Sequence, residues 1–133
     1  MKTIDANIIL RYLTNDVPEQ AARSAILIQK IKAGKEHVYL PDIFIADIIW
    51  ILEKFYKTSR ENIKNAITAI VTMPGMVTAD IYVILAALDT YSGSKIDWSD
   101  SLAAAQMLNL GMDTIYTFDK HFDEIDGITR IEP

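Results

Sequence analysis

Short extended runs of apolar residues alternate with longer stretches of helical periodicity along this chain, and that alternation limits the folds it can adopt. Five runs have the character of strands: 1–4, 37–40, 76–78, 114–117 and 128–131. Six stretches have helical spacing: 7–13, 18–33, 42–57, 59–72, 80–91 and 97–110. This order predicts an α/β protein whose parallel sheet is covered by helices on both faces. No repeat or linker interrupts it, so we expect one domain over residues 1–133.

Several helix boundaries are marked by individual residues. Pro18 suits the first turn of a helix, where its missing N–H costs nothing. Ser59, followed three residues later by Asn62, resembles a capping box in which Asn replaces the usual Glu or Gln. Asp80 is placed to cap the next helix. Ser92-Gly93-Ser94 predicts a turn after that helix.

Four aspartates occupy positions where a charge is costly: Asp5, Asp47, Asp100 and Asp119. Asp5 and Asp119 each follow a predicted strand, and Asp100 lies near the start of a helix. Asp47 is the one charge within the apolar run 43–52. Sites in parallel sheets form beyond the carboxyl ends of the strands. Carboxylates that converge there repel one another unless a hard divalent cation such as Mg²⁺ or Mn²⁺ neutralises them. The pattern therefore predicts a metal-dependent enzyme acting on phosphate esters.

Three of these aspartates also have a structural interpretation as helix caps. Asp5 could cap the first helix, and Asp119 could cap a short helix over 120–124. Asp97 has the position of an N-cap, and Asp100 then lies at N3, where the helix dipole favours an acid. Asp100 nevertheless shares its face with apolar residues, so we favour a role as ligand for Asp100 and keep Asp97 as a further candidate.

Asp47 is surrounded by apolar residues on almost every side, with Ile43 and Trp50 on its own face. We therefore expect a functional role for its carboxylate. The structural alternative is a buried salt bridge to Arg11 or Arg23.

Two polar residues lie close to the acids in sequence. Asn7 could orient the Asp5 carboxylate or contact a substrate from the same turn. Thr117, two residues before Asp119, could hydrogen-bond a ligand or hold the turn. His37 and His121 are expected to be structural or exposed.

Composition excludes several other classes of protein. The chain has no cysteine and only two histidines, which argues against structural zinc and favours a reducing cytoplasm. No run of about 20 apolar residues predicts a membrane span. The net charge of −5 argues against a strongly basic nucleic-acid binder, although acids that bind metal would leave room for a polyanionic substrate. No phosphate-binding Gly-rich loop and no nucleophile motif occurs.

Once the acids are placed, the chain resembles PIN-domain proteins, and specifically the VapC toxins of toxin–antitoxin pairs. The resemblance rests on four motifs in order: 4–10 with Asp5 and Asn7, 46–56 with Asp47, 97–105 with Asp97 and Asp100, and 117–122 with Asp119. In the second motif the family usually has Glu. Asp47 is one methylene shorter, which predicts a water-mediated metal contact or a small shift of its helix.

The resemblance implies a three-layer α/β/α fold with a five-stranded parallel sheet and an RNA phosphodiester substrate. It also implies a cognate antitoxin whose tail occupies the active-site groove, frequent homodimers, and products with a 5′-phosphate and a 3′-hydroxyl. Within this framework Mg²⁺ or Mn²⁺ would be held by Asp5, Asp100 and Asp119. Asp47 would ligate the ion or orient water, and Asn7 and Thr117 would position substrate or ligands.

Other functions remain open at this point. A Mg²⁺-dependent phosphohydrolase of small phosphoesters also gathers acids at strand ends, and a PIN-like module with weakened catalysis could serve only to bind protein. The apolar stripe Ile63, Ile67 and Ile70 could dock a second copy or an antitoxin helix, or could pack against the sheet.

Overall fold

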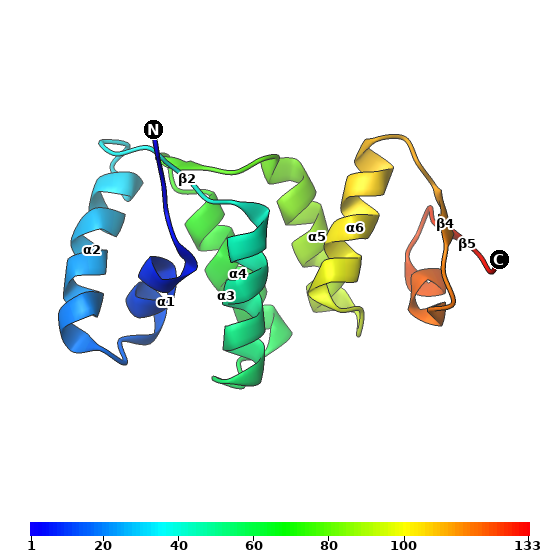
Figure 1. Ribbon diagram of the computed structural model, residues 1–133, viewed down its shortest axis with the longest axis horizontal. Helices are drawn as coiled ribbons and strands as arrows, with labels where there is room; N and C mark the ends of the chain where they lie inside the picture. The colour runs from blue at the N-terminus through cyan, green and yellow to red at the C-terminus, as the bar shows by residue number, and fades with distance from the viewer. The chain divides into compact units, whose positions relative to one another are not determined.

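The computed structural model describes all residues from Met1 to Pro133, and the chain divides into two compact units (Figure 1). We call Met1–Ala79 the N-terminal unit and Asp80–Pro133 the C-terminal unit. The N-terminal unit holds β1 (Lys2–Thr3), α1 (Ala6–Thr14), α2 (Pro18–Lys32), β2 (Val38–Tyr39), α3 (Asp42–Lys54), α4 (Arg60–Val71) and β3 (Met76–Val77). The C-terminal unit holds α5 (Ile81–Gly93), α6 (Trp98–Asn109), β4 (Thr114–Tyr116), a 3₁₀ helix η1 (Lys120–Glu124) and β5 (Thr129–Ile131).

The three strands of the N-terminal unit form one parallel sheet in the order β1-β2-β3. Val38 is opposite both Lys2 and Met76, so β2 is the central strand. The strands pair in parallel because the helices between them carry the chain back, so that each strand begins at the same end of the sheet. The predicted α/β class with parallel strands is thereby confirmed for this unit.

Gly75 lets β3 enter the sheet beside the end of α2. Its N–H donates to the Ile31 carbonyl at 2.9 Å, and a Cβ at this position would lie 2.0 Å from the Glu36 carbonyl oxygen. Only a residue without a side chain fits there, since real Cβ atoms do not approach an oxygen so closely.

Isoleucines fill the core of the N-terminal unit. Ile9 of α1, Ile28 of α2 and Ile45 of α3 are fully buried. The stripe Ile63, Ile67 and Ile70 on α4 is buried as well, with at most 1% of each side chain exposed. Burying such a side chain contributes about 1.5–3 kcal/mol. The interpretation of this stripe as a docking surface is therefore wrong, and its alternative, packing in the core, is confirmed.

In the C-terminal unit α5 and α6 pack side by side, with Tyr91 against Trp98 edge to face at 6.0 Å between ring centroids. The strands β4 and β5 pair in parallel through Ile115 and Arg130. A small core beneath them contains Ile96, Ala104, Phe122 and Ile125. Ala104 and Phe122 in that core bring α6 and η1 together, which matters for the site described below.

All five predicted strands form and all pair in parallel, but they do so as a sheet of three and a sheet of two. The single five-stranded sheet in three layers remains a prediction. The capping box is confirmed, since the Asn62 N–H donates to Ser59 Oγ at 3.2 Å. Asp80 caps α5 as predicted, but α5 continues through Gly93, so the turn predicted at Ser92-Gly93-Ser94 begins too early. Every helix is too short or too polar to pass through a lipid bilayer.

Candidate functional site

Asp5 directly follows β1, whose register is fixed by a hydrogen bond from the Ile4 N–H to the Tyr39 carbonyl at 2.9 Å. Asp5 occupies the N-cap position of α1 with extended backbone angles, yet its side chain accepts no hydrogen bond from the first turn. The sequence alternative of a capping side chain is therefore wrong. The carboxylate is exposed and is left to bind a ligand.

Asp47 lies near Asp5, because α3 packs against α1. The two aspartates, together with Asn7 and Trp50, line a pocket of about 330 Å³ in the N-terminal unit. The structure thus brings together three of the residues that the sequence singled out, from two helices about forty positions apart. We call this hollow the acid pocket.

The expected burial of Asp47 is wrong. Asp47 is exposed, and its neighbours Ile43 and Trp50 on the same face are 66% and 63% exposed. The buried side of α3 is formed by Ile48 and Ile49 instead. An apolar run cannot reveal which of its faces meets the core when both faces are apolar.

The buried salt bridge considered for Asp47 is also absent. Arg11 donates from Nε to Gln20 Oε1 at 2.9 Å, and Arg23 pairs with Glu19 at 3.7 Å. Both arginines point to α2 partners, so the Asp47 carboxylate remains free of an arginine partner and open to the acid pocket.

A second group of acids forms in the C-terminal unit around Asp100. Asp97 is the N-cap residue of α6, without a side-chain bond to the first turn, and Asp100 lies at the third helical position. Burial raises the pKa of Asp100, and the charges of Asp119 and Asp97 raise it further. A hydrogen bond shared with Asp119 acts in the same direction, while His121 opposes them. Asp100 is thus a carboxylate among like charges, and its role as a metal ligand stays a prediction.

Asp119 is held in place by its own turn at the end of β4. Its N–H donates to Thr117 Oγ1 at 3.0 Å, and its Oδ1 accepts the His121 N–H at 2.9 Å. The predicted cap of a short helix over 120–124 is confirmed, and Thr117 holds the turn. Capping and the contact with His121 both use Oδ1 of this carboxylate.

His121 was expected to be structural or exposed, and the structure places it in the acid cluster. Its Nδ1 lies 3.0 Å from Asp119 Oδ1, and its side chain is about half exposed. A histidine two residues after an N-cap aspartate turns back toward that aspartate in a tight 3₁₀ turn. That spacing was visible in the sequence.

Arg130 of β5 supports the same turn. Its Nη1 donates to the Thr117 carbonyl at 3.4 Å, and its Nε donates to Asp123 Oδ1 at 3.2 Å. The guanidinium ties both ends of the Asp119 turn to β5. The sequence contained no signal for this role.

The donors at these positions suit a hard cation, because they are carboxylate and amide oxygens without a thiol. Asp100 adds a specific reason, since a cation would relieve the repulsion that raises its pKa. In neither unit, however, do three or more acidic or histidine side chains lie close enough together to hold a metal ion. The residues fit Mg²⁺ or Mn²⁺ by the chemistry of their donor atoms and not by the number of ligands that either unit brings together.

The comparison with known families bears on the whole chain. The sequence model of the family described as "PIN domain" matches residues 2–128. The chain belongs to the PIN-domain family. This PIN-domain chain is also similar to a protein named VapC ribonuclease from Aquifex aeolicus (strain VF5), with 21% identity over 133 residues. The match covers 100% of this chain and 97% of that relative, so the likeness is a full-length one.

Proposed function

We propose that this PIN-domain chain is a metal-dependent endoribonuclease of the VapC toxin type. The observation that carries the proposal is the group of Asp97, Asp100 and Asp119, in which repulsion and burial raise the pKa of Asp100. A protein maintains such a group of like charges at a cost, and a divalent cation is the usual reason. The similarity to a VapC ribonuclease supports RNA as the substrate.

The chemistry follows from the side chains present. The proposed ligands of Mg²⁺ or Mn²⁺ are Asp5 and Asp47 in the N-terminal unit and Asp97, Asp100 and Asp119 in the C-terminal unit. When bound, such an ion lowers the pKa of a water molecule and neutralises charge on the phosphoryl oxygens. Asn7 borders the acid pocket and would orient the substrate, whereas Thr117 fixes the direction of Asp119. The chain needs no nucleophilic side chain for this hydrolysis.

The proposal includes the finer features that the family resemblance implies. The chain would act in the cytoplasm as a single domain over residues 1–133, with one five-stranded sheet. Its products would carry a 5′-phosphate and a 3′-hydroxyl. A cognate antitoxin would inhibit it, and homodimers would form.

The direct test uses purified protein, without partner, and structured RNA. We expect cleavage with Mg²⁺ or Mn²⁺ and none with EDTA, and we expect Asp5→Asn to lose activity. Asp126→Asn is the matched control, because Asp126 is an exposed aspartate in the turn before β5. Cleavage of equal rate in EDTA would contradict the metal mechanism. Protein that hydrolyses only small phosphoesters, or that binds an antitoxin without cutting RNA, would contradict the ribonuclease.

A further inference from the structure

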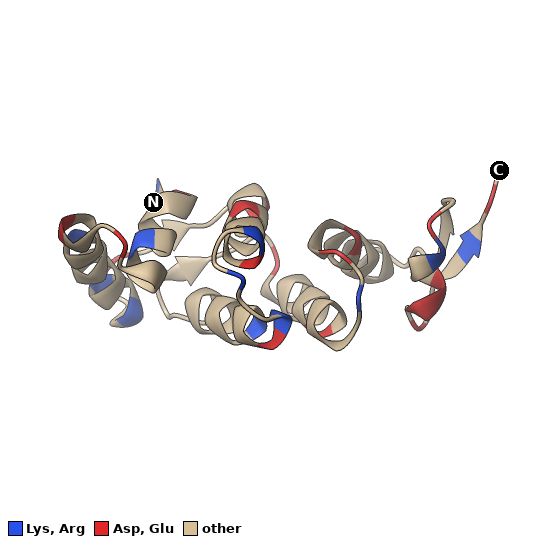
Figure 2. Ribbon diagram, turned by 90° about the horizontal axis from the view of Figure 1, so that it is seen from below, with Lys and Arg blue, Asp and Glu red and all other residues tan.

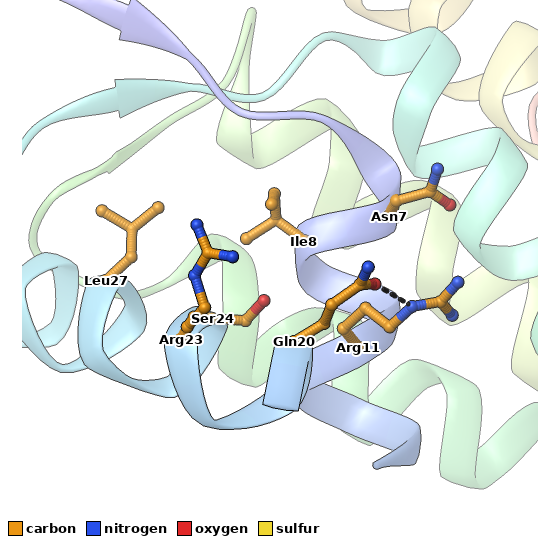
Figure 3. Close-up of a pocket in the computed structure, with 7 residues that line it drawn as sticks. All are labelled: Asn7, Ile8, Arg11, Gln20, Arg23, Ser24 and Leu27. Atoms are coloured by element: carbon orange, nitrogen blue, oxygen red, sulfur yellow. Dashed lines mark hydrogen bonds between the residues drawn. The ribbon is translucent and has the colours of Figure 1, made fainter. Parts of the chain in front are cut away.

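A second pocket of the N-terminal unit, of about 410 Å³, lies between α1 and α2 (Figure 3). Its lining includes Arg11 and Arg23, two of the four arginines in the chain. Gln20 and Ser24 contribute polar atoms from α2, and the Ser24 hydroxyl points toward α1. We call this hollow the arginine pocket. None of the acidic residues described above lines this pocket.

Arg11 is prepared to bind an anion. Its Nε donates to Gln20 Oε1 at 2.9 Å, which fixes the plane of the guanidinium (Figure 3). Asp16, which lines a neighbouring hollow together with Arg11, accepts a hydrogen bond from the Tyr56 hydroxyl and forms no ion pair with Arg11. The hydrogen bond of Arg11 uses Nε, so both terminal nitrogens keep their donors for a ligand. A guanidinium held in one plane matches two oxygens of a phosphate.

Arg23 contributes a second positive charge from α2, with its guanidinium directed away from that of Arg11 (Figure 3). Its only ion pair is with Glu19, one turn away on α2, at 3.7 Å with both side chains exposed. Such an exposed pair is worth about 0–1 kcal/mol, so a more highly charged ligand displaces it readily. Lys and Arg are spread over α1 and α2 in Figure 2, although the chain as a whole carries a net charge of −5.

The arginine pocket adjoins the acid pocket at Asn7, which lines both hollows. Asn7 and Arg11 are one helical turn apart on α1, a rise of about 6 Å. A ligand that spans the two hollows must therefore bind beside carboxylates at one end and beside guanidinium groups at the other. A chain of phosphodiesters does this when a cation accompanies the phosphate at the acid end, whereas an acidic peptide carries no group suited to cleavage there.

We propose that the arginine pocket binds the RNA backbone next to the scissile linkage, with Arg11 as the main positioning residue for one phosphate and Arg23 as a separate positive charge further along the strand. This assignment rests on the proposed ribonuclease function and adds a substrate subsite to it. The positive charge of this subsite would allow RNA, a polyanion, to bind to a protein whose net charge is negative.

The test measures binding of a short single-stranded RNA with Ca²⁺ in place of Mg²⁺ or Mn²⁺, under conditions in which no cleavage is detected, so that a cation still accompanies the phosphate at the acid end. Arg11→Gln is expected to weaken binding about tenfold. It should also reduce the slope of log affinity against log salt by about 0.7, the value for one lost phosphate contact. Arg11→Lys keeps the charge without the planar fork and should recover part of the affinity. Melting curves confirm that both variants are folded.

The matched control for the second arginine is Lys30→Gln. Lys30 lies on the same exposed face of α2, two turns beyond Arg23. Lys30→Gln therefore removes the same positive charge as Arg23→Gln, but outside the pocket. Arg23→Gln should weaken RNA binding and Lys30→Gln should leave it unchanged. Equal losses in the two variants would overturn the pocket, since they would show only the effect of net charge.

A single neutral methylphosphonate, moved along the RNA, locates the contact. One position beside the scissile linkage should weaken binding to the wild-type protein and have no further effect on Arg11→Gln. Equal sensitivity of both proteins at every position would overturn the proposal. So would absence of RNA binding by wild type, or polyglutamate that binds as tightly as RNA and responds equally to Arg11→Gln.

The outcomes separate this proposal from the ribonuclease activity. RNA binding that depends on Arg11, in a protein that never cleaves, would support the pocket and contradict the nuclease. Cleavage by Arg11→Gln with an unchanged KM would overturn the pocket and leave the nuclease intact. If both hold, the loss in Arg11→Gln falls mainly on KM, because the residue binds a part of the substrate away from the reacting bond.

Discussion

Asp100, in the first turn of α6, feels the negative charge of Asp119, which follows the end of β4, and this charge adds to burial in raising the pKa of Asp100. Burial and a neighbouring like charge both favour the protonated form of a carboxyl group. A divalent cation can take the place of that proton. The proximity of Asp119 therefore makes Asp100 a residue whose behaviour should respond both to pH and to metal.

The first prediction concerns pH. Burial and the neighbouring acids raise the pKa of Asp100 in the folded protein above its ordinary value, so the folded state binds the proton more tightly than the unfolded state. Without metal, the free energy of unfolding should therefore fall as pH rises from the ordinary aspartate pKa, about 3.9, to the raised value. Asp100→Asn should flatten this part of the profile, measured by urea unfolding. A wild-type profile that rises through this window, with no difference from Asp100→Asn, would contradict the arrangement.

Metal affinity should rise with pH over the range in which the free energy of unfolding falls. Protons compete with the cation for Asp100, so Mn²⁺ binding should weaken as pH falls through the raised pKa. Isothermal titration at several pH values measures this. Affinity that is independent of pH in this range would exclude Asp100 as a ligand.

Thr117 should matter through the direction of Asp119. Thr117→Val removes the acceptor at 3.0 Å from the Asp119 N–H, which should cost about 1 kcal/mol of stability and lower the rate of RNA cleavage. Thr117→Ser keeps the hydroxyl and should retain both. Thr114→Val is the control, since Thr114 donates only to the exposed Asp113. Equal cleavage rates for Thr117→Val and Thr114→Val would remove the positioning role.

Gly75 provides a test of the sheet in the N-terminal unit. Gly75→Ala would place a Cβ 2.0 Å from the Glu36 carbonyl, and we expect a loss on the order of 3 kcal/mol in unfolding free energy. Gly93→Ala is the matched control, because nothing lies within 4 Å of a Cβ there at the end of α5. It should be neutral or stabilise by up to about 1 kcal/mol. Thermal melts of the two variants that agree would refute the close approach of β3 and α2.

The sequence was most informative where a single residue type determines local geometry. Ser59, Asp80 and Asp119 cap their helices as predicted, because a side-chain oxygen at an N-cap has one simple function. The acids after β1 and β4 were likewise predicted from their position at strand ends. Local chemistry was sufficient for these features.

The sequence was least informative where tertiary packing decides. Both faces of α3 are apolar, so the exposure of Asp47 and Trp50 depends on which face meets α1 and α4. The arginine pocket joins Arg11 and Arg23 across the connection between α1 and α2, where Asn15 takes a left-handed conformation with φ of 56°. No periodicity in the sequence reports that approach.

The most direct test of the central claim is RNA cleavage by wild type and Asp100→Asn with and without Mn²⁺, together with their melting temperatures. Asparagine keeps the size of the side chain and is tolerated near a helix start. If Asp100 serves the metal, cleavage should fall by roughly a hundredfold or more, the Mn²⁺-induced rise in melting temperature should shrink, and the metal-free protein should melt at the same or a higher temperature because repulsion from Asp119 is relieved. An Asp100→Asn protein that cleaves RNA at the wild-type rate would contradict the assignment.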